Sequence, residues 1–349
     1  MTPTTTRAAD GVRPPDGTTP GATPGATPGT TPGTTPGAAA RGARPAPAAG
    51  RRQGRRETLA GYLFLTPWCI GILLLTLGPM LVSLYLAFTD YNLFDSPRWI
   101  GFKNFRDLFE DDRWWTSVQV TLKYVLIGTP LKLAAALAVA LLLVKPRKGQ
   151  GFYRSAFYAP SLIGASVSIG VVWRAIFNDN AVVDKSMSLF GWDVGGWIGD
   201  PDWALPTLIT LTVWQFGAPM VIFLAGLKQV PGELYEAAEM DGAGRWRRFR
   251  SITLPMISPV LFFNLLLELI HSFQVFTSAV VIAGSGTNTG GPGDSLLVYG
   301  WYLYEQGFRN LRMGYAAAMA WMLMLGIGLV TAVLFRTQRG WVHYEEDAQ

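Results

Sequence analysis

Residues 233–255 read ELYEAAEMDGAGRWRRFRSITLP and separate two strongly apolar stretches of the chain. Glu233 to Met240 is rich in residues that favour helices, and its acids lie early, where the helix dipole stabilises negative charge. The run Asp241–Gly244 interrupts this helix, and Arg245 to Ile252 predicts a second short helical segment that stops before Pro255. The stretch is too polar to enter a bilayer, so we expect a compact helix–turn–helix at a membrane surface.

On either side of this loop, six apolar stretches suit the roughly 20 helical residues that cross a hydrocarbon core. They lie near Leu59–Phe88, Val118–Val144, Ala156–Phe177, Leu205–Leu227, Ile257–Ala283 and Met313–Phe335. Half of the chain is hydrophobic and only 15% is charged, whereas about a quarter of the residues in soluble domains are charged. We therefore predict an all-α integral membrane protein with six transmembrane helices, and an ordinary soluble enzyme is not indicated.

The distribution of basic residues predicts the orientation of the spans, because short cytoplasmic loops are enriched in lysine and arginine. Basic clusters precede the first span and fill the second and fourth connections, which contain Arg51, Arg52, Arg55, Arg56, Lys145, Arg147, Lys148, Arg154, Arg245, Arg247, Arg248 and Arg250. The third connection instead carries five aspartates and one lysine. Both termini are therefore expected in the cytoplasm. Because the net charge of +5 comes from these clusters, no nucleic-acid partner is indicated.

The chain divides by composition into three parts. Residues 19–37 read TPGATPGATPGTTPGTTPG, a low-complexity repeat with almost no apolar surface to offset the entropy of ordering it. We predict a disordered cytoplasmic tail over residues 1–56, a six-helix transmembrane domain over 57–338, and a short cytoplasmic tail over 339–349.

Polar side chains inside the fifth span are candidates for function, since such groups are costly in a membrane. Asn264, Glu268 and His271 are spaced by four and three residues, which places them on one helical face, and Ser272 and Gln274 follow. We expect this face to line a polar path. The alternative is that these groups only form hydrogen bonds between helices. For any single residue, the spacing does not separate the two interpretations.

Lys132 lies inside the second span, and the sequence gives no account of it. Catalysis is not indicated, because the only histidines, His271 and His343, are far apart and no His-x-x-x-His or Gly-x-Ser-x-Gly pattern occurs. The chain also lacks Gly-x-x-x-x-Gly-Lys-Ser/Thr, the phosphate-binding loop of many ATPases. We expect no catalytic or metal site and no ATP hydrolysis by this chain alone.

The central loop resembles the EAA loop of binding-protein-dependent ABC importer permeases. The matching pattern is Glu236-Ala237-Ala238, three residues, Gly242, nine residues and Ile252-x-Leu254-Pro255, within a loop that we place at 231–256. Asp241-Gly242-Ala243, Phe249 and Pro259 further resemble the carbohydrate branch of that family, which includes maltose, glycerol-phosphate and multiple-sugar importers.

The resemblance implies the type I ABC importer permease fold, with the EAA helix docked in a groove of a cytoplasmic ATPase. It assigns the ATPase-coupling role to Glu236, Ala237, Ala238, Asp241, Gly242, Leu254 and Pro255. The implied partners are a second permease in a heterodimer, two copies of the ATPase, an extracytoplasmic sugar-binding lipoprotein, the sugar and the lipid bilayer. No cofactor is expected in this chain, because the ATPase would bind ATP and magnesium.

The resemblance also implies that the fifth span lines the substrate pathway in a bacterial inner membrane, with Glu268 and Ser272 at matching positions. The fourth span would contribute Trp214 and Gln215, an aromatic ring and an amide suited to a sugar. A self-sufficient secondary transporter of a small polar solute is the alternative. Such a protein typically shows an inverted repeat and needs no ATPase loop.

Overall fold

The computed structural model describes residues 50–342 except 147, 165–166, 179–180, 190, 192–195 and 285–289, with side chains from Gly61 onward. The chain divides into two units, one ending at Phe64 and one beginning at Leu65. The described part of the first unit is a stretch of the first helix, which begins at Gly50, inside the tail predicted over residues 1–56. The rest of that tail, His343 and the end of the chain lie outside the described residues.

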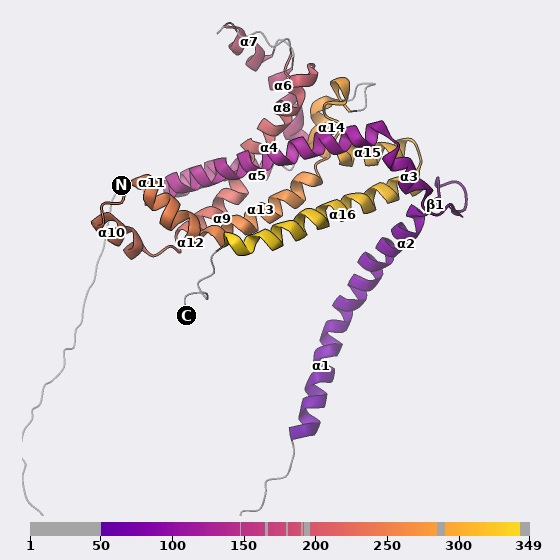
Figure 1. The fold of residues 1–349 in the computed structure, drawn as a ribbon, viewed down its shortest axis with the longest axis horizontal. Coiled ribbons are helices and arrows are strands. Elements are labelled where there is room, and N and C mark those ends of the chain that lie inside the picture. The colour runs from indigo at the N-terminus through magenta and orange to yellow at the C-terminus, as the bar shows by residue number, and fades with distance from the viewer. Residues whose placement is uncertain are drawn as a thin grey trace, which may run out of the picture. The chain divides into compact units, whose positions relative to one another are not determined.

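The described residues are almost entirely helical (Figure 1). The first helices are α1 (Gly50–Gly71), α2 (Gly78–Ala87), α3 (Lys103–Phe109), α4 (Asp112–Leu143), α5 (Gln150–Gly164), α6 (Val167–Phe177), α7 (Val182–Ser188) and α8 (Pro201–Trp214). They are followed by α9 (Gly217–Leu227), α10 (Gly232–Met240), α11 (Arg245–Arg248), α12 (Leu254–Met256), α13 (Ser258–Phe273), α14 (Thr277–Ala283), α15 (Tyr299–Tyr304) and α16 (Met313–Thr337).

Short segments of other backbone geometry connect these helices. They are the π-helical turns η1 (Ile72–Leu77), η2 (Phe249–Thr253) and η4 (Glu305–Arg309), the 3₁₀ turns η3 (Pro292–Asp294) and η5 (Gln338–Gly340), and the strands β1 (Thr89–Asp90) and β2 (Arg98–Trp99). The strands pair antiparallel, with Thr89 opposite Trp99.

The predicted spans overlap three long helices and three bent helix pairs, of which the last, Arg245–Met256 with Ser258–Phe273, begins in the central loop. Within the described ranges, Gly61–Ala87, Asp112–Leu143 and Met313–Gly340 are long and apolar enough to cross a membrane, and the bent pairs raise the number to six if each pair is one span. The fourth span is α8 and α9, bent by 43°. The predicted all-α fold with up to six spans is confirmed.

The helical segment after the central loop extends further than the sequence indicates. The prediction that it stops before Pro255 is wrong, because helical backbone continues from Arg245 to Met256. Pro255 is the second residue of α12, directly after the π-helical turn η2, so its missing N–H falls where the regular α-helical hydrogen-bond pattern is already interrupted. The chain then bends by 68° into α13.

Helix α4 is the centre of the packing and contacts α8, α9, α13 and α15. Near its C-terminal end, Ala136 and Ala140 are fully buried against the α9 residues Met220 and Phe223. Small residues let helices approach closely in lipid, where van der Waals packing replaces the hydrophobic effect as the attraction between helices. Figure 1 shows α10, α11 and α12 together at one end of the bundle, which we call the loop end, and α3, α14 and α15 at the opposite end.

Gly217, the first residue of α9, is the point where α9 meets α5. A Cβ at this position would lie 2.6 Å from the backbone oxygen of Phe157 and 2.8 Å from Cα of Tyr158. Since the obstructing atoms belong to the backbone of α5, no side chain can turn aside to make room. The absence of a side chain at Gly217 therefore fixes the spacing of these two helices.

We expect Gly217→Ala to lower the melting temperature of the purified protein in detergent. Overpacking typically costs about 1–3 kcal/mol, which corresponds to roughly 2–10 °C for a chain of this size. Gly328→Ala is the matched control, because nothing lies within 4 Å of a Cβ at Gly328 in α16. Equal melting temperatures for the two variants would show that the α5–α9 contact is not tight.

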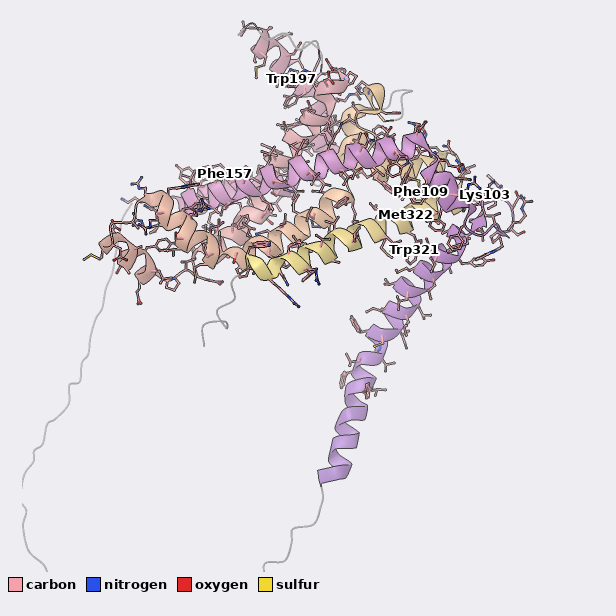
Figure 2. The ribbon with its side chains drawn as sticks, in the orientation of Figure 1. Lys103, Phe109, Phe157, Trp197, Trp321 and Met322 are labelled. Carbon is pink, nitrogen blue, oxygen red and sulfur yellow. The ribbon has the colours of Figure 1, made fainter. Side chains whose placement is uncertain are left out.

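At the opposite end, Asp111 caps α4 and binds two other helices. Its carboxylate accepts hydrogen bonds from the backbone N–H groups of Arg113 and Trp114, and from the hydroxyls of Tyr302 and Tyr315. Arg113 forms ion pairs of 3.1 Å with both Asp294 and Glu305. On the same side of the bundle, Trp321 and Met322 pack against an aromatic cluster that includes Trp114 and Tyr315 (Figure 2).

Burial alone would raise the pKa of the Asp111 carboxyl, but hydrogen bonds from Tyr302, Tyr315 and the two backbone N–H groups outweigh it and lower the pKa. A lowered folded-state pKa stabilises the fold above the unfolded-state value and loses that contribution as the pH falls through the folded-state value. We expect Asp111→Asn to lower the melting temperature at pH 7 by about 3–10 °C. The difference from wild type should shrink below about pH 4. The exposed neighbour Asp112 provides the control Asp112→Asn, and a pH-independent difference would contradict the assignment.

Candidate functional site

The central loop forms a short surface helix followed by a tight turn, as predicted. Helix α10 ends at Met240, and Gly242 follows with φ +73°, a left-handed conformation that glycine adopts without strain. The turn is closed by hydrogen bonds from the N–H of Gly242 to the carbonyl of Glu239 (3.0 Å) and from the N–H of Ala243 to that of Ala238 (2.8 Å). The turn after α10 thus requires glycine at position 242.

Two side-chain contacts attach α10 to the segment that follows the turn. The Tyr235 hydroxyl lies 2.9 Å from Oγ1 of Thr253, and Arg248 donates to Glu239 over 2.8 Å. Leu254 and Pro255, which directly follow Thr253, are half-buried. Since the chain enters α13 directly after Ile257, a displacement of α10 would reach a membrane helix through a short and firmly packed connection.

The outward surface of this loop is exposed and partly apolar. Glu236, Ala237 and Asp241 are exposed and Ala238 is half-buried, while Met240 and Trp246 are 89% and 73% exposed. Large apolar side chains that are exposed together are typical of protein interaction sites. The two alanines leave room for close approach of another protein surface.

The fourth span is interrupted where the sequence places a candidate sugar contact. Helix α8 ends at Trp214, and Gln215 is the half-buried residue that follows. Ser161 of α5 donates to the backbone oxygen of Gln215 over 3.0 Å, and the backbone N–H of Ala218 donates to the Ser161 hydroxyl over 3.1 Å. The Trp214 ring centre lies 5.7 Å from that of Trp173.

Gln215 lines a hollow of about 200 Å³ in which three interrupted helices meet. The other residues of this hollow, which we call the break hollow, are Gly164, Val167, Gly170, Thr277, Ser278 and Val281. They come from the ends of α5 and α6 and from α14, beyond the interruption at 274–276. Interrupted helices in transporters commonly surround a solute path near the middle of the membrane. The sequence prediction missed Thr277.

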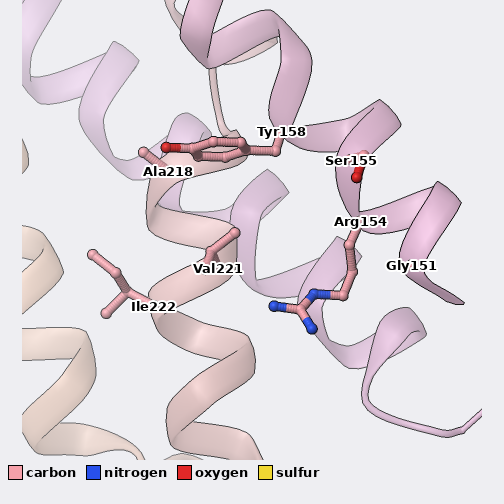
Figure 3. Close-up of a pocket in the computed structure, with 7 residues that line it drawn as sticks. All are labelled: Gly151, Arg154, Ser155, Tyr158, Ala218, Val221 and Ile222. Atoms are coloured by element: carbon pink, nitrogen blue, oxygen red, sulfur yellow. The ribbon is translucent and has the colours of Figure 1, made fainter.

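A larger hollow of about 660 Å³ lies between α5 and α9 (Figure 3). Its lining consists of Gly151, Arg154, Ser155, Tyr158, Ala218, Val221 and Ile222. Figure 3 shows Tyr158 beside Ala218 and the Arg154 side chain extending towards α9. Both hollows contain amide, hydroxyl or guanidinium groups and no acid, so they suit a polar solute with hydroxyl groups.

The five candidate residues of the fifth span do not share one environment. Asn264, Glu268 and Ser272 are 3%, 7% and 3% exposed, whereas His271 and Gln274 are exposed. Successive positions four apart drift by only about 40° around a helix, so the first three form one row that faces neighbouring helices. His271 and Gln274 lie on the other edge of the predicted face.

Glu268 is paired with Lys132 of α4. The Lys132 ammonium lies 2.7 Å from Oε1 of Glu268, and the two side chains are only 13% and 9% exposed. One turn away, the hydroxyls of Thr129 and Ser272 are 3.0 Å apart. The buried Asn264 amide nitrogen has no hydrogen-bond partner among the described residues. The structure therefore accounts for Lys132, whose partner lies 136 positions further along the chain.

Within the described ranges, no group of three or more His, Cys, Asp or Glu side chains is placed to hold a metal ion.

Residues 112–339 match the family described as binding-protein-dependent transport system inner membrane component. The chain belongs to this family. It is 47% identical over 296 residues to a probable ABC transporter permease protein, YesP of Bacillus subtilis, covering 84% of this chain and 95% of the relative. It is 30% identical over 280 residues to AmyD of Thermoanaerobacterium thermosulfurigenes, a probable permease for starch degradation products, covering 80% and 94%.

A solved structure of a bacterial alginate ABC transporter, in complex with a periplasmic protein that carries an alginate pentasaccharide, has a similar fold. The TM-score is 0.70 at 25% sequence identity, and the match covers 82% of this chain and 96% of that chain. The family resemblance drawn from the central loop is thus confirmed. The chain is a multi-pass inner-membrane component of a transport system, and its family consists of transport subunits rather than enzymes.

Proposed function

We propose that this chain is a permease subunit of an ATP-driven, binding-protein-dependent sugar importer. The observation that carries the proposal is the exposed α10 loop, which is attached directly to α13 within a chain of this family. The sugar assignment is supported by relatives named for starch degradation products, lactose and arabinooligosaccharides.

The proposed coupling site is the EAA loop. Glu236 would meet donors in a cytoplasmic ATPase, Ala237 and Ala238 would permit close contact, and Gly242 provides the turn. Asp241, Leu254 and Pro255 complete the loop. Two copies of the ATPase would bind ATP and magnesium and perform the hydrolysis. Closure of the ATPase dimer would move α10 as a rigid body and displace α13.

The proposed substrate pathway follows the two hollows along α5 and α9. Trp214 and Gln215 lie at its narrow part, with His271 and Gln274 on the exposed edge of α13 and Asn264, Glu268 and Ser272 in the row behind them. A second permease would complete the pathway. An extracytoplasmic lipoprotein would deliver the sugar to the outer loops, and both termini would lie in the cytoplasm of a bacterial cell.

Reconstitution provides the test of this proposal. The chain would be placed in proteoliposomes with its second permease, ATPase and binding protein, and uptake of a panel of radiolabelled sugars would be measured. We expect uptake that requires both ATP and the binding protein, and ATP hydrolysis that the loaded binding protein stimulates. Uptake driven by an ion gradient without ATP would instead establish a secondary transporter.

A further inference from the structure

We propose that the Lys132–Glu268 ion pair is a joint that fixes α13 to α4, so that movement of the EAA loop reaches the helices around the break hollow. On this proposal, Lys132 and Glu268 are positioning residues, and the Glu268 carboxylate does not bind the transported sugar. The proposal rests on the ATP-driven transport function described above.

The depth of Lys132 requires a partner inside the protein. Within the span predicted over Val118–Val144, Lys132 is 12 residues from the nearer end, a distance of about 18 Å along a helix. A lysine side chain reaches the membrane interface only from near a helix end, so the Lys132 ammonium cannot reach water in this way. Glu268 is equally enclosed, and each residue neutralises the charge of the other across 2.7 Å.

Among the described residues, a second polar contact joins the same two helices. Thr129 and Ser272, one turn along each helix, are joined by a second hydrogen bond of 3.0 Å. Two contacts one turn apart oppose both sliding and rotation of α13 along α4. Apolar side chains alone would resist such sliding weakly, because lipid is as good a solvent for them as the neighbouring helix.

The two helices joined by the ion pair, α13 and α4, lead to the EAA loop and to the break hollow respectively. Helix α13 follows the 68° bend at the end of the EAA loop. Helix α4 is held to α8 by a hydrogen bond of 2.7 Å between Tyr124 and Thr212, and α8 ends beside Gln215. The ion pair is therefore the charged element on a continuous route from the loop to the break hollow.

A direct role for Glu268 in sugar binding fits the geometry less well. Its Oε1 atom already accepts from Lys132, its side chain is 9% exposed, and the lining of neither hollow includes it. A sugar hydroxyl would have to displace a buried charged partner. His271 and Gln274, on the exposed edge of α13, do not have this obstacle.

The main experiment measures transport by the complete complex in proteoliposomes. The variants are Glu268→Gln, Lys132→Met and the charge exchange Lys132→Glu/Glu268→Lys, with Lys123→Met as the control because Lys123 is exposed on α4. We expect each single variant to reduce the maximal uptake rate per assembled complex at least tenfold, with KM for the loaded binding protein changed less than twofold. The ATP hydrolysed per sugar should rise. The exchange should restore the rate to within about threefold of wild type, and the control should match wild type.

Three results would overturn the joint. A raised KM that the charge exchange does not restore would assign Glu268 to the sugar. A smaller amount of assembled complex, with unchanged uptake per complex, would show that the Lys132–Glu268 pair contributes to folding and not to transport. Wild-type uptake by Glu268→Gln would show that the pair is dispensable.

A second measurement does not depend on transport. In a Cys69→Ser background, Thr129→Cys and Ser272→Cys should form a disulfide rapidly, and Lys132→Met should slow its formation at least fivefold. An unchanged cross-linking rate would contradict the joint. Absence of ATP-dependent uptake by the wild-type complex would instead overturn the proposed function. The cross-linking result would then decide on its own whether the Lys132–Glu268 pair fixes α13 to α4.

Discussion

Gly242→Val is expected to reduce sugar uptake and association with the ATPase at least tenfold, whereas Gly244→Val leaves both near wild-type levels. Gly242 has φ +73°, a conformation that costs an L-residue about 1–2 kcal/mol and a β-branched residue more. Gly244 has φ −66° and ψ 166°, which valine adopts readily. Neither glycine has any atom within 4 Å of a Cβ placed on it, so the two substitutions differ in backbone strain and not in crowding.

The consequence of the strain at Gly242 follows from the hydrogen bonds that close the turn. If residue 242 leaves the left-handed region, the bonds to Glu239 and Ala238 break and α10 loses its direction relative to α11. A misdirected α10 no longer presents Glu236 and Ala237 together with Trp246 of α11 as one surface. We expect co-purification of the ATPase and ATP-dependent uptake each to fall at least tenfold. Equal behaviour of the two valine variants would show that the left-handed turn does not matter for coupling.

The sequence predicts the loop and the spans well because both depend on local signals. Runs of apolar residues reach bilayer length wherever a helix crosses, and helix formers followed by Asp241-Gly242 indicate a helix and a turn within a few residues. The prediction at Pro255 is wrong for a local reason, since proline ends a helix in most positions but is accepted where the α-helical hydrogen-bond pattern is already interrupted. Here the interruption is the π-helical turn over Phe249–Thr253, which the residues around Pro255 do not indicate.

The candidate site was predicted less completely, because its geometry depends on contacts between distant segments. The spacing of Asn264, Glu268 and His271 defines a face about 60° wide, yet α4 covers only one part of it. No local pattern reveals that boundary. Lys132 and Glu268 could have been matched as two opposite charges within apolar spans, but their facing positions follow only from the packing of α4 against α13.

Filling the break hollow is expected to stop transport without dismantling the complex. Ser278 of α14 is half-buried and lines this hollow of about 200 Å³. A phenylalanine ring at this position would occupy much of that space and place an apolar surface beside Gln215. We expect Ser278→Phe to reduce ATP-dependent sugar uptake at least tenfold. The ATPase should still co-purify, because the proposed coupling loop lies at the loop end, away from the substitution.

Two further variants distinguish blockage from general damage. Val171→Phe adds the same ring to α6 at a residue that is 57% exposed and does not line the hollow, so uptake should remain near wild type. Ser278→Ala keeps the hollow open and removes one hydroxyl. We expect KM for uptake to rise two- to twelvefold, because the loss of a hydrogen bond costs about 0.5–1.5 kcal/mol. Wild-type uptake by Ser278→Phe would place the sugar path elsewhere. Loss of the ATPase from that variant would show that the hollow supports assembly, because a blocked path alone leaves the loop surface intact.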